Sequence, residues 1–420
     1  MSRAASVVAA VIGVVVIVAG ALSLIRGEAP PAPPIAPTAS PAAPTGSATA
    51  GGSATAAASR AVGEVSVRMG KVTAASEFRY VVSGGADTFR VILLDLGAGA
   101  ATEVATVSVG AGGNPADGPY LFTSASRDGR AVLLTVNVPG ARSTVLLLRP
   151  EAGEARELYR GAPFDRAVIS PDGIRYALSR AADDPAVDGV WVGTLGAGPL
   201  RRLVADDPSA SGAPPVPVAF APDDQTLAVR VNVGDGVSEV FLIPVAAAEG
   251  RVARDLDPVR IVGGDALAVG GANVDFGDGR EILVWTGQNP FGGANLVSLF
   301  DRETRRRTEL YRPPRPTSQA TEVTIADAAW HPRRDRFVTV ERQFCCGANL
   351  PSGVFVRGRD GTAREVARGA FFLEVWWSRD GARLFATTGG DDSTGSVIDL
   401  FTGTVVVRYC LRGPGPPPCP

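Results

Sequence analysis

From residue 62 to about residue 411, the chain alternates short apolar runs rich in Val, Leu, Ile and Phe with segments of Gly, Asp, Pro and Asn. Long stretches with the 3.6-residue period of an amphipathic helix are absent from this region. Short apolar runs bounded by turn residues are typical of β-strands joined by hairpins. The pattern therefore predicts an all-β fold for residues 62–411.

A tetrapeptide of turn residues recurs between the apolar runs. One copy is Ser170-Pro171-Asp172-Gly173, which stands directly before a run that begins at Ile174. Pro presets φ near −65°, Asp accepts hydrogen bonds from nearby backbone N–H groups, and Gly supplies a positive φ. Each copy is therefore expected to be the corner of a hairpin. The residues expected to shape these turns are Asp128, Gly129, Asp172, Gly173, Asp223, Asp278, Gly279, Asp380 and Gly381.

Successive copies of this corner motif are 44 to 55 residues apart, and an apolar hairpin follows each of them. Repeats of about 40 to 50 residues with several strands each are the signature of propeller blades. We expect a β-propeller of seven four-stranded blades. Six and eight blades are the alternatives, because the first repeat, residues 62–110, has strands but no clear corner. Residues 62–70 could supply a strand for closure, and a β-sandwich is the competing architecture.

The corner, followed by a hairpin such as SVIDLFTGTVVV (396–407), resembles the TolB-like or WD-like β-propeller repeat family over residues 62 to about 411. The chain departs from the repeat at Asp224, at Phe276-Gly277 and at Arg333-Arg334. The resemblance implies the fold and says little about function. Propellers of this kind occur in scaffolds, in translocation accessories and in the non-catalytic domains of peptidases.

The N-terminal segment predicts membrane attachment. Residues 4–25 carry no charge, and about 20 apolar residues suffice to cross a bilayer as a helix. The length of this run favours a retained signal anchor, which would comprise residues 1–27. A cleaved signal peptide is the alternative. Residues 28–61 are Pro-, Ala-, Thr-, Ser- and Gly-rich and should stay unfolded as a linker, and 412–420 form a Pro-rich tail. We expect a single-pass protein of the cell membrane with its propeller on the extracytoplasmic side.

The amino-acid composition limits the classes of partner, metal site and catalytic site that we expect. The formal net charge is −2 with no basic block, which argues against a nucleic-acid partner. The single histidine, His331, occupies the Ser position of a corner motif and is interpreted as a turn residue. Acidic pairs such as Asp183-Asp184 match no calcium-loop spacing and are interpreted as solvated turns. We therefore expect no cofactor and no metal, and assign no catalytic residue.

The face opposite the corners is the predicted binding face, because longer loops on a rigid scaffold commonly carry binding residues. Two of its loops resemble each other, QNPFGGANL (288–296) and QFCCGANL (343–350). The preferred explanation of their likeness is shared ancestry of neighbouring repeats together with Gly-Ala-Asn turn chemistry, and the alternative is a composite ligand patch. The candidate binding residues are Gln288, Asn289, Phe291, Asn295, Gln343, Phe344 and Asn349.

These features favour a membrane-tethered scaffold that binds a protein or another cell-envelope ligand. The alternative is an extracytoplasmic hydrolase or lyase with an acidic, Ca²⁺-assisted site at the mouth of the propeller channel. The shortage of histidine and the lack of a convergent acidic motif favour the scaffold.

All four cysteines, Cys345, Cys346, Cys410 and Cys419, lie in the C-terminal fifth. An outward-facing domain lies where disulfides persist. The local pairing 410–419 with 345–346 is preferred. The alternatives are free thiols, or a bond from Cys345 or Cys346 to the C-terminal pair.

Overall fold

The computed structural model describes residues 64–410 with interruptions. The gaps are 74, 86, 111–118, 139–141, 162–165, 183, 185, 208–213, 235–236, 248–249, 257–259, 263–267, 270–271, 278, 287–295, 315–321, 346–347, 350–351, 370 and 390–393.

The described strands form seven antiparallel four-stranded sheets, which confirms the predicted all-β propeller with seven blades. From the inner strand outward, the first blade has β2 (Phe78–Gly85), β3 (Thr88–Asp95), β4 (Ala100–Val109) and β1 (Val65–Met69). The second has β5 (Tyr120–Ala125), β6 (Val132–Asn137), β7 (Ser143–Arg149) and β8 (Glu154–Gly161). The third has β9 (Ala167–Ile169), β10 (Arg175–Arg180), β11 (Gly189–Thr194) and β12 (Ala197–Ala205).

The remaining blades follow the same order. The fourth has β13 (Val216–Phe220), β14 (Thr226–Gly234), β15 (Val237–Pro244) and β17 (Arg260–Val262). The fifth has β19 (Ala272–Asp275), β20 (Glu281–Thr286), β21 (Leu296–Asp301) and β22 (Arg306–Tyr311). The sixth has β23 (Glu322–Trp330), β24 (Arg336–Cys345), β26 (Gly353–Gly358) and β27 (Ala363–Arg368), and the seventh has β28 (Phe371–Trp377), β29 (Leu384–Gly389), β30 (Thr394–Asp399) and β31 (Thr404–Cys410).

Short additional elements decorate three blades. Strand β16 (Arg251–Val252) extends the third blade, β18 (Ala268–Val269) pairs with β15, and β25 (Ala348–Asn349) pairs with β24. A single turn of helix, α2 (Ala253–Leu256), follows β16. Over the described part of the chain, no helix has both the length and the apolar character to cross a bilayer.

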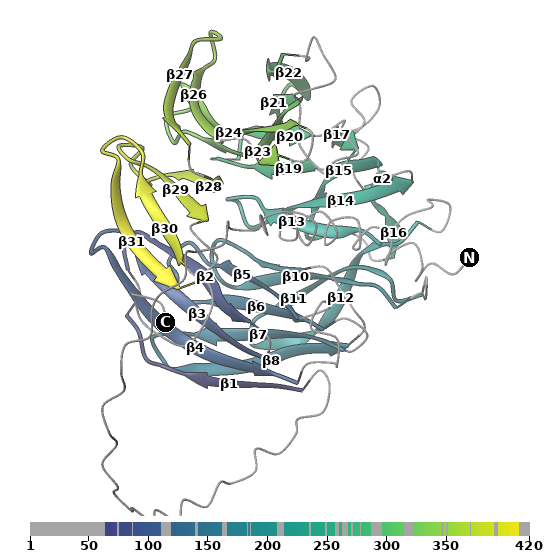
Figure 1. Ribbon diagram of the computed structural model, residues 1–420. Helices are drawn as coiled ribbons and strands as arrows, with labels where there is room; N and C mark the ends of the chain where they lie inside the picture. The colour runs from purple at the N-terminus through teal and green to yellow at the C-terminus, as the bar shows by residue number, and fades with distance from the viewer. Residues whose placement is uncertain are drawn as a thin grey trace, which may run out of the picture.

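The inner strands form a ring around a central channel. Each contacts the inner strand of the next blade, from β2 through β5, β9, β13, β19 and β23 to β28. The ring closes where Arg79 of β2 pairs with Glu374 of β28, at 3.0 Å between Nη2 and Oε2. Figure 1 shows the blades following one another from purple to yellow, with the last beside the first.

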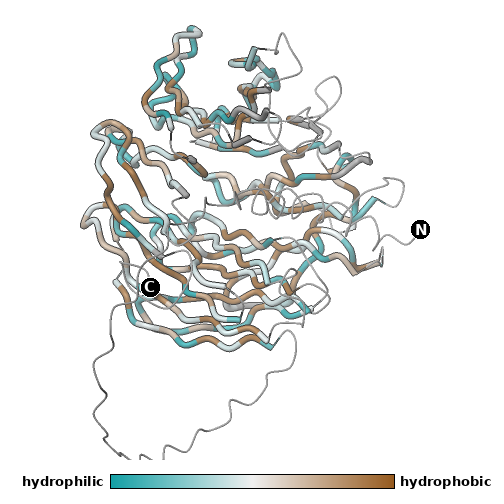
Figure 2. The backbone as a smooth tube through the Cα atoms, in the orientation of Figure 1, coloured by the Kyte–Doolittle hydropathy of each residue, from teal (hydrophilic) through white to brown (hydrophobic). Residues whose placement is uncertain are grey.

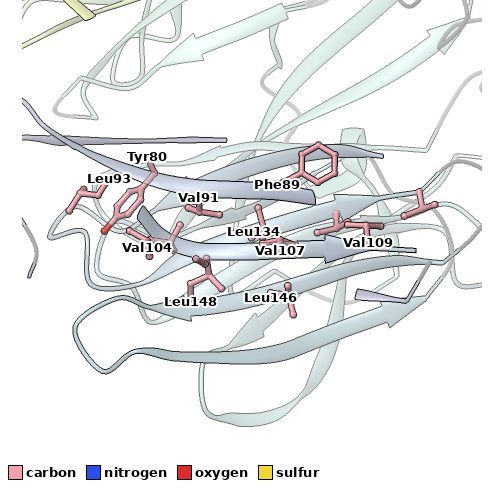
Figure 3. Close-up of a cluster of buried hydrophobic side chains, with 14 residues drawn as sticks. Tyr80, Phe89, Val91, Leu93, Val104, Val107, Val109, Leu134, Leu146 and Leu148 are labelled. Atoms are coloured by element: carbon pink, nitrogen blue, oxygen red, sulfur yellow. The ribbon is translucent and has the colours of Figure 1, made fainter. Parts of the chain in front are cut away.

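Burial explains why the middle strands read as continuous apolar runs. Each middle strand has a neighbouring blade on both faces, so residues 132–136 of β6 are all buried. The outer strand β8 is largely exposed and correspondingly polar. Figure 2 shows hydrophobic residues running along the strands. Between the first two blades, Val91 and Leu93 pack with Leu134 (Figure 3), and fully burying such a side chain contributes about 1.5–3 kcal/mol.

The innermost described strand of the first blade, β2, runs in the direction of the second strands of the other blades: the Leu96 N–H donates to the Glu77 carbonyl at 3.0 Å, as the Leu195 N–H donates to the Ile174 carbonyl at 2.7 Å beside β10. In the second blade, β5 runs toward the face that carries the corners and ends at Ala125, directly before the corner residue Ser126. Strand β2 begins on that face, because the Phe78 ring lies against Gly129 and Glu77 accepts a hydrogen bond from the Arg379 N–H. It therefore runs away from the corner face. A strand that leaves this face has no corner at its end, which explains the missing motif in residues 62–110.

Closure differs from the predicted arrangement in one respect. Strand β1, within residues 62–70, does supply a strand, but it pairs with β4 as the outermost strand of its own blade. The hairpin within residues 91–107 is therefore not the outer edge of the first blade. The four main strands of each blade come from one continuous stretch of chain, and no described strand pairing joins the first blade to the last.

Several predictions fall outside the described residues. They are the membrane segment 4–25, the linker, the tail, Asp278, Cys346 and Cys419. Cys345 ends β24 and Cys410 ends β31, but the described structure does not extend to their side chains. The domain boundaries and the disulfide pairing stay predictions.

Candidate functional site

The corner tetrapeptides are tight turns held by their own side chains. In the second blade, the Ser126 hydroxyl donates to Asp128 at 2.7 Å and accepts the Ala131 N–H at 3.1 Å. Asp128 also accepts the Arg130 N–H at 3.0 Å, and Gly129 has φ of 73°. The same contacts recur from Ser170 and from Ser378. Asp172, Gly173, Asp223, Asp380 and Gly381 thus lie in turns between first and second strands, and Gly279 has the same positive φ.

Two departures from the motif keep its backbone conformation. Asp224 and Arg334 stand where other corners have Gly, and they adopt φ of 57° and 59°. Both are in the left-handed region that disfavours residues with a Cβ. Asp224 gains a partner there, because its carboxylate accepts the Asp172 N–H of the preceding corner at 3.0 Å. Sequence departures in blades four and six therefore leave the turn intact.

Neighbouring corners are hydrogen-bonded into a ring. The Arg127 N–H donates to the Pro171 carbonyl at 2.9 Å, and Arg302 bridges Asp223 and the Gly279 carbonyl at 3.3 and 2.9 Å. Across the seventh and second blades, Arg379 Nη2 donates to the Arg127 carbonyl at 3.0 Å. This last bond passes over the first blade, which has no corner. Hydrogen bonds thus connect the six corners across all seven blades.

His331 belongs to this ring and has structural partners at both nitrogens. Nε2 lies 3.1 Å from the Gly381 carbonyl oxygen, which can only accept, so Nε2 donates. Nδ1 accepts the Arg333 N–H at 3.1 Å. The ring is 1% exposed and packs edge-on against Trp377, with centroids 4.5 Å apart. This geometry supports the interpretation of His331 as a turn residue.

Partly buried carboxylates cap the free edges of inner strands. Asp327 of β23 accepts the Val375 N–H of the next inner strand at 2.9 Å, and Asp275 of β19 accepts the Trp330 N–H at 2.8 Å. An inner strand has backbone donors with no strand partner, and burying them unpaired is costly. Burial raises the pKa of Asp275 and raises that of Asp327 to about 7, with the Glu374 charge adding to the latter.

The channel wall beside β2 is the candidate site. Arg79 pairs with Glu374 and lies over the Trp376 ring, 4.8 Å from its centroid. Two large apolar side chains are exposed on the flanking inner strands, Phe122 of β5 at 42% and Leu373 of β28 at 38%. Leu373 is the bulged residue of β28, where the register shifts between Phe372 and Glu374. The wall therefore combines an apolar surface with an accessible ion pair.

A cavity of about 240 Å³ lies at the corner ends of the inner strands of blades two to four. Its lining includes Arg127, Pro171 and Phe220, next to the corner ring. Among the described residues, no group of three or more His, Cys, Asp or Glu side chains could hold a metal ion. The wall and the cavity present charged, hydrogen-bonding and apolar groups.

Replacing Asp327 with Asn should remove a pH-dependent loss of stability. The folded-state pKa of about 7 exceeds the ordinary value of 3.8, so the folded protein binds more protons than the unfolded chain between these values. The free energy of unfolding contributed by this group therefore falls as pH rises through this window. Asn can still accept the Val375 N–H. At pH 8, Asp327→Asn should be about 1–3 kcal/mol more stable than the unmodified protein, and at pH 4 the advantage should vanish, as measured by urea unfolding.

The predicted binding loops lie only partly within the described residues. Gln288, Asn289, Phe291 and Asn295 lie outside the described residues. Gln343 and Phe344 are in β24 and Asn349 is in β25, where Phe344 pairs with Asn349 in a short hairpin. Their side chains lie outside the described structure, so their role stays a prediction.

Sequence reasoning missed Arg79, Asp327 and Glu374. A signal was available for the two acids, because each stands four residues before the first residue of a corner, His331 or Ser378. An acidic residue that interrupts an apolar strand at a repeated distance from the corner indicates a special position on the inner strand. Arg79 carried no such signal, because its blade lacks the corner.

Comparisons with known proteins give a fold and no family. No family model matches the chain, and no curated protein matches it. Solved structures resemble it at low identity. A prolyl endopeptidase has 12% identity and a TM-score of 0.49 over 81% of this chain, which spans about half (49%) of the endopeptidase.

Two further structures have similar scores. The β-propeller domain of the Trilobed protease from Pyrococcus furiosus has 11% identity and a TM-score of 0.46, covering 68% of this chain and 82% of that one. TolB from Acinetobacter baumannii has 12% identity and a TM-score of 0.41, covering 80% and 82%. At such values the likeness carries no statement about activity, and the chain is described by its own architecture, a seven-bladed β-propeller.

Proposed function

We propose that this protein is a membrane-tethered, extracytoplasmic binding scaffold whose ligand, a protein or another component of the cell envelope, contacts the channel wall beside β2. One observation carries the proposal: Phe122 of β5 and Leu373 of β28 are exposed on the strands that flank β2, the strand whose Arg79 pairs with Glu374. Exposed apolar side chains next to a charged pair are typical of recognition surfaces. The tether is supported by the uncharged segment 4–25 and the linker that follows it.

The enzyme alternative has one observation in its favour. The charge of Glu374 helps to raise the pKa of Asp327, so two carboxylates on the channel wall interact as acid–base pairs in hydrolases and lyases do. Both groups, however, have structural partners: Asp327 accepts a backbone N–H and Glu374 pairs with Arg79. Because both carboxylates already have structural partners, we favour binding over catalysis.

The test uses the full-length chain in its own membranes with chemical cross-linking. Replacing Phe122 and Leu373 together with Ser should abolish the cross-link to one specific partner. Ile174→Ser is the matched control, because Ile174 is also exposed, at 51%, but follows a corner instead of lining the wall. A partner retained by the double variant, or lost equally with Ile174→Ser, would contradict the proposed site.

The proposed orientation predicts that protease treatment of intact cells releases the propeller, residues 62–420, while a cytoplasmic marker stays intact. The reason is that the linker is composed of residues that cannot form a packed core and should be cut readily. Immunodetection of the propeller in the supernatant is the measurement. Protection of the chain on intact cells, followed by cleavage after the cells are opened, would place the propeller inside.

A further inference from the structure

A second pocket lies on the corner face, away from the channel. It has a volume of about 550 Å³ and lies between the sixth and seventh blades. The sixth blade contributes its corner end and its outer turn, and the seventh contributes the turn between β30 and β31. Its lining includes the side chains of Asp335, Arg336, Arg359, Asp360, Arg364 and Phe401.

Phe401 differs in type from the residues at the same turn position in the other blades. It is the third residue of the turn Asp399-Leu400-Phe401-Thr402-Gly403, and its side chain is 41% exposed. The same position in the other six blades is held by small or acidic residues: Gly97, Glu151, Gly196, Ala246, Glu303 and Asp360. The turn itself therefore does not require an aromatic ring. The ring packs on one side against Trp377, with centroids 5.9 Å apart, and its exposed part is open to a ligand.

The pocket also carries three arginines placed on aromatic rings. The guanidinium carbon of Arg364 is 5.7 Å from the centroid of Phe401, that of Arg336 is 6.0 Å from Trp377, and that of Arg359 is 5.0 Å from Trp330. Such stacking fixes the plane of a guanidinium and leaves its N–H groups free to bind at the edge.

These arginines differ in how far their charge is already neutralised. Arg359 binds Glu281 through both terminal nitrogens, and Arg336 pairs with Asp335 at 3.3 Å. Arg364 is exposed, and among the described residues it has no ion pair. Arg364 is thus the cation of the pocket that is available to an anionic ligand, beside the exposed Phe401 ring.

The remaining lining restricts the ligand class. Asp335 and Asp360 are exposed carboxylates, which repel a purely anionic molecule and accept hydrogen bonds from hydroxyl groups. A ligand that satisfies the whole pocket needs an anionic group for Arg364, hydroxyl donors for the carboxylates, and an apolar ring face for Phe401. We propose that this pocket binds an acidic oligosaccharide, with one sugar ring on Phe401 and its carboxylate on Arg364.

The experiment is titration calorimetry on the full-length chain in detergent with three probes: an oligomer of glucuronic acid, the matching neutral glucose oligomer, and inorganic phosphate. The glucuronate oligomer should bind, and the other two should bind at least tenfold more weakly, because each lacks the charge or the ring. Arg364→Gln and Phe401→Ser should each weaken glucuronate binding at least tenfold, since a charged hydrogen bond or a ring contact is lost.

Arg306→Gln, which removes an exposed arginine from the outer strand of the neighbouring blade, should leave binding unchanged. Because Arg364 and Phe401 are exposed, both variants should keep the thermal unfolding of the unmodified protein. Failure of the glucuronate oligomer to bind at millimolar concentration would overturn the proposal, as would equal binding by Arg364→Gln or by Phe401→Ser. Equal binding of the neutral oligomer would overturn the requirement for an acidic group, and equal binding of phosphate would overturn the sugar class.

Discussion

Replacing Gly381 with Ala should lower the free energy of unfolding by about 2–4 kcal/mol, because it combines an unfavourable backbone conformation with a steric clash. Gly381 has φ of 74°, which costs a residue with a Cβ about 1–2 kcal/mol. The added Cβ would lie 2.5 Å from Nε2 of His331. That ring is buried and packed edge-on against Trp377, so it has little room to move. Urea unfolding monitored by tryptophan fluorescence measures the change.

Gly403→Ala is the matched control for this prediction. Gly403 lies in the same blade with φ of 69°, and a Cβ there would meet no atom within 4 Å. It should cost only the backbone term, about 1–2 kcal/mol. If Gly381→Ala and Gly403→Ala destabilise equally, the close packing of successive corners contributes nothing to stability.

The corner chemistry explains how much of the fold could be predicted from sequence. A tight turn needs particular residues at particular places, so Ser170-Pro171-Asp172-Gly173 and its copies mark the blade spacing directly. The middle strands were recognisable for a related reason, since burial between two blades demands continuous apolar runs. The fold class and the blade number therefore follow from local chemistry that repeats.

Other features depend on contacts between distant segments. The place of β2 within its blade does not follow from its apolar pattern, because a strand has the same pattern whether it runs toward or away from the corner face. Phe401 belongs to an ordinary turn by sequence, and only its exposure and its neighbours Arg364 and Trp377 give it a role. The Arg79–Glu374 pair joins residues 295 positions apart.

The second large effect is expected at the boundary that closes the ring. Blades one and seven are joined by no described strand pairing, and their boundary is an apolar cluster built around Leu94 and Phe385, both with 0% exposure. The surrounding polar contacts add little, because Arg79 and Glu374 are 41% and 53% exposed and such pairs are worth at most about 1 kcal/mol. Ring closure thus depends on side-chain packing.

Phe385→Ala should therefore destabilise the protein by about 3–5 kcal/mol and should do so locally, by opening the ring between the first and last blades. Phe337→Ala is the matched control, since Phe337 is equally buried, with 0% exposure, in the cluster between blades five and six. Its boundary is also crossed by the chain itself, between β22 and β23. Native-state hydrogen exchange should show faster exchange in β2, β3 and β29–β31 for Phe385→Ala, and a uniform change for Phe337→Ala. Uniform exchange in both variants would mean that the ring opens only when the whole propeller unfolds.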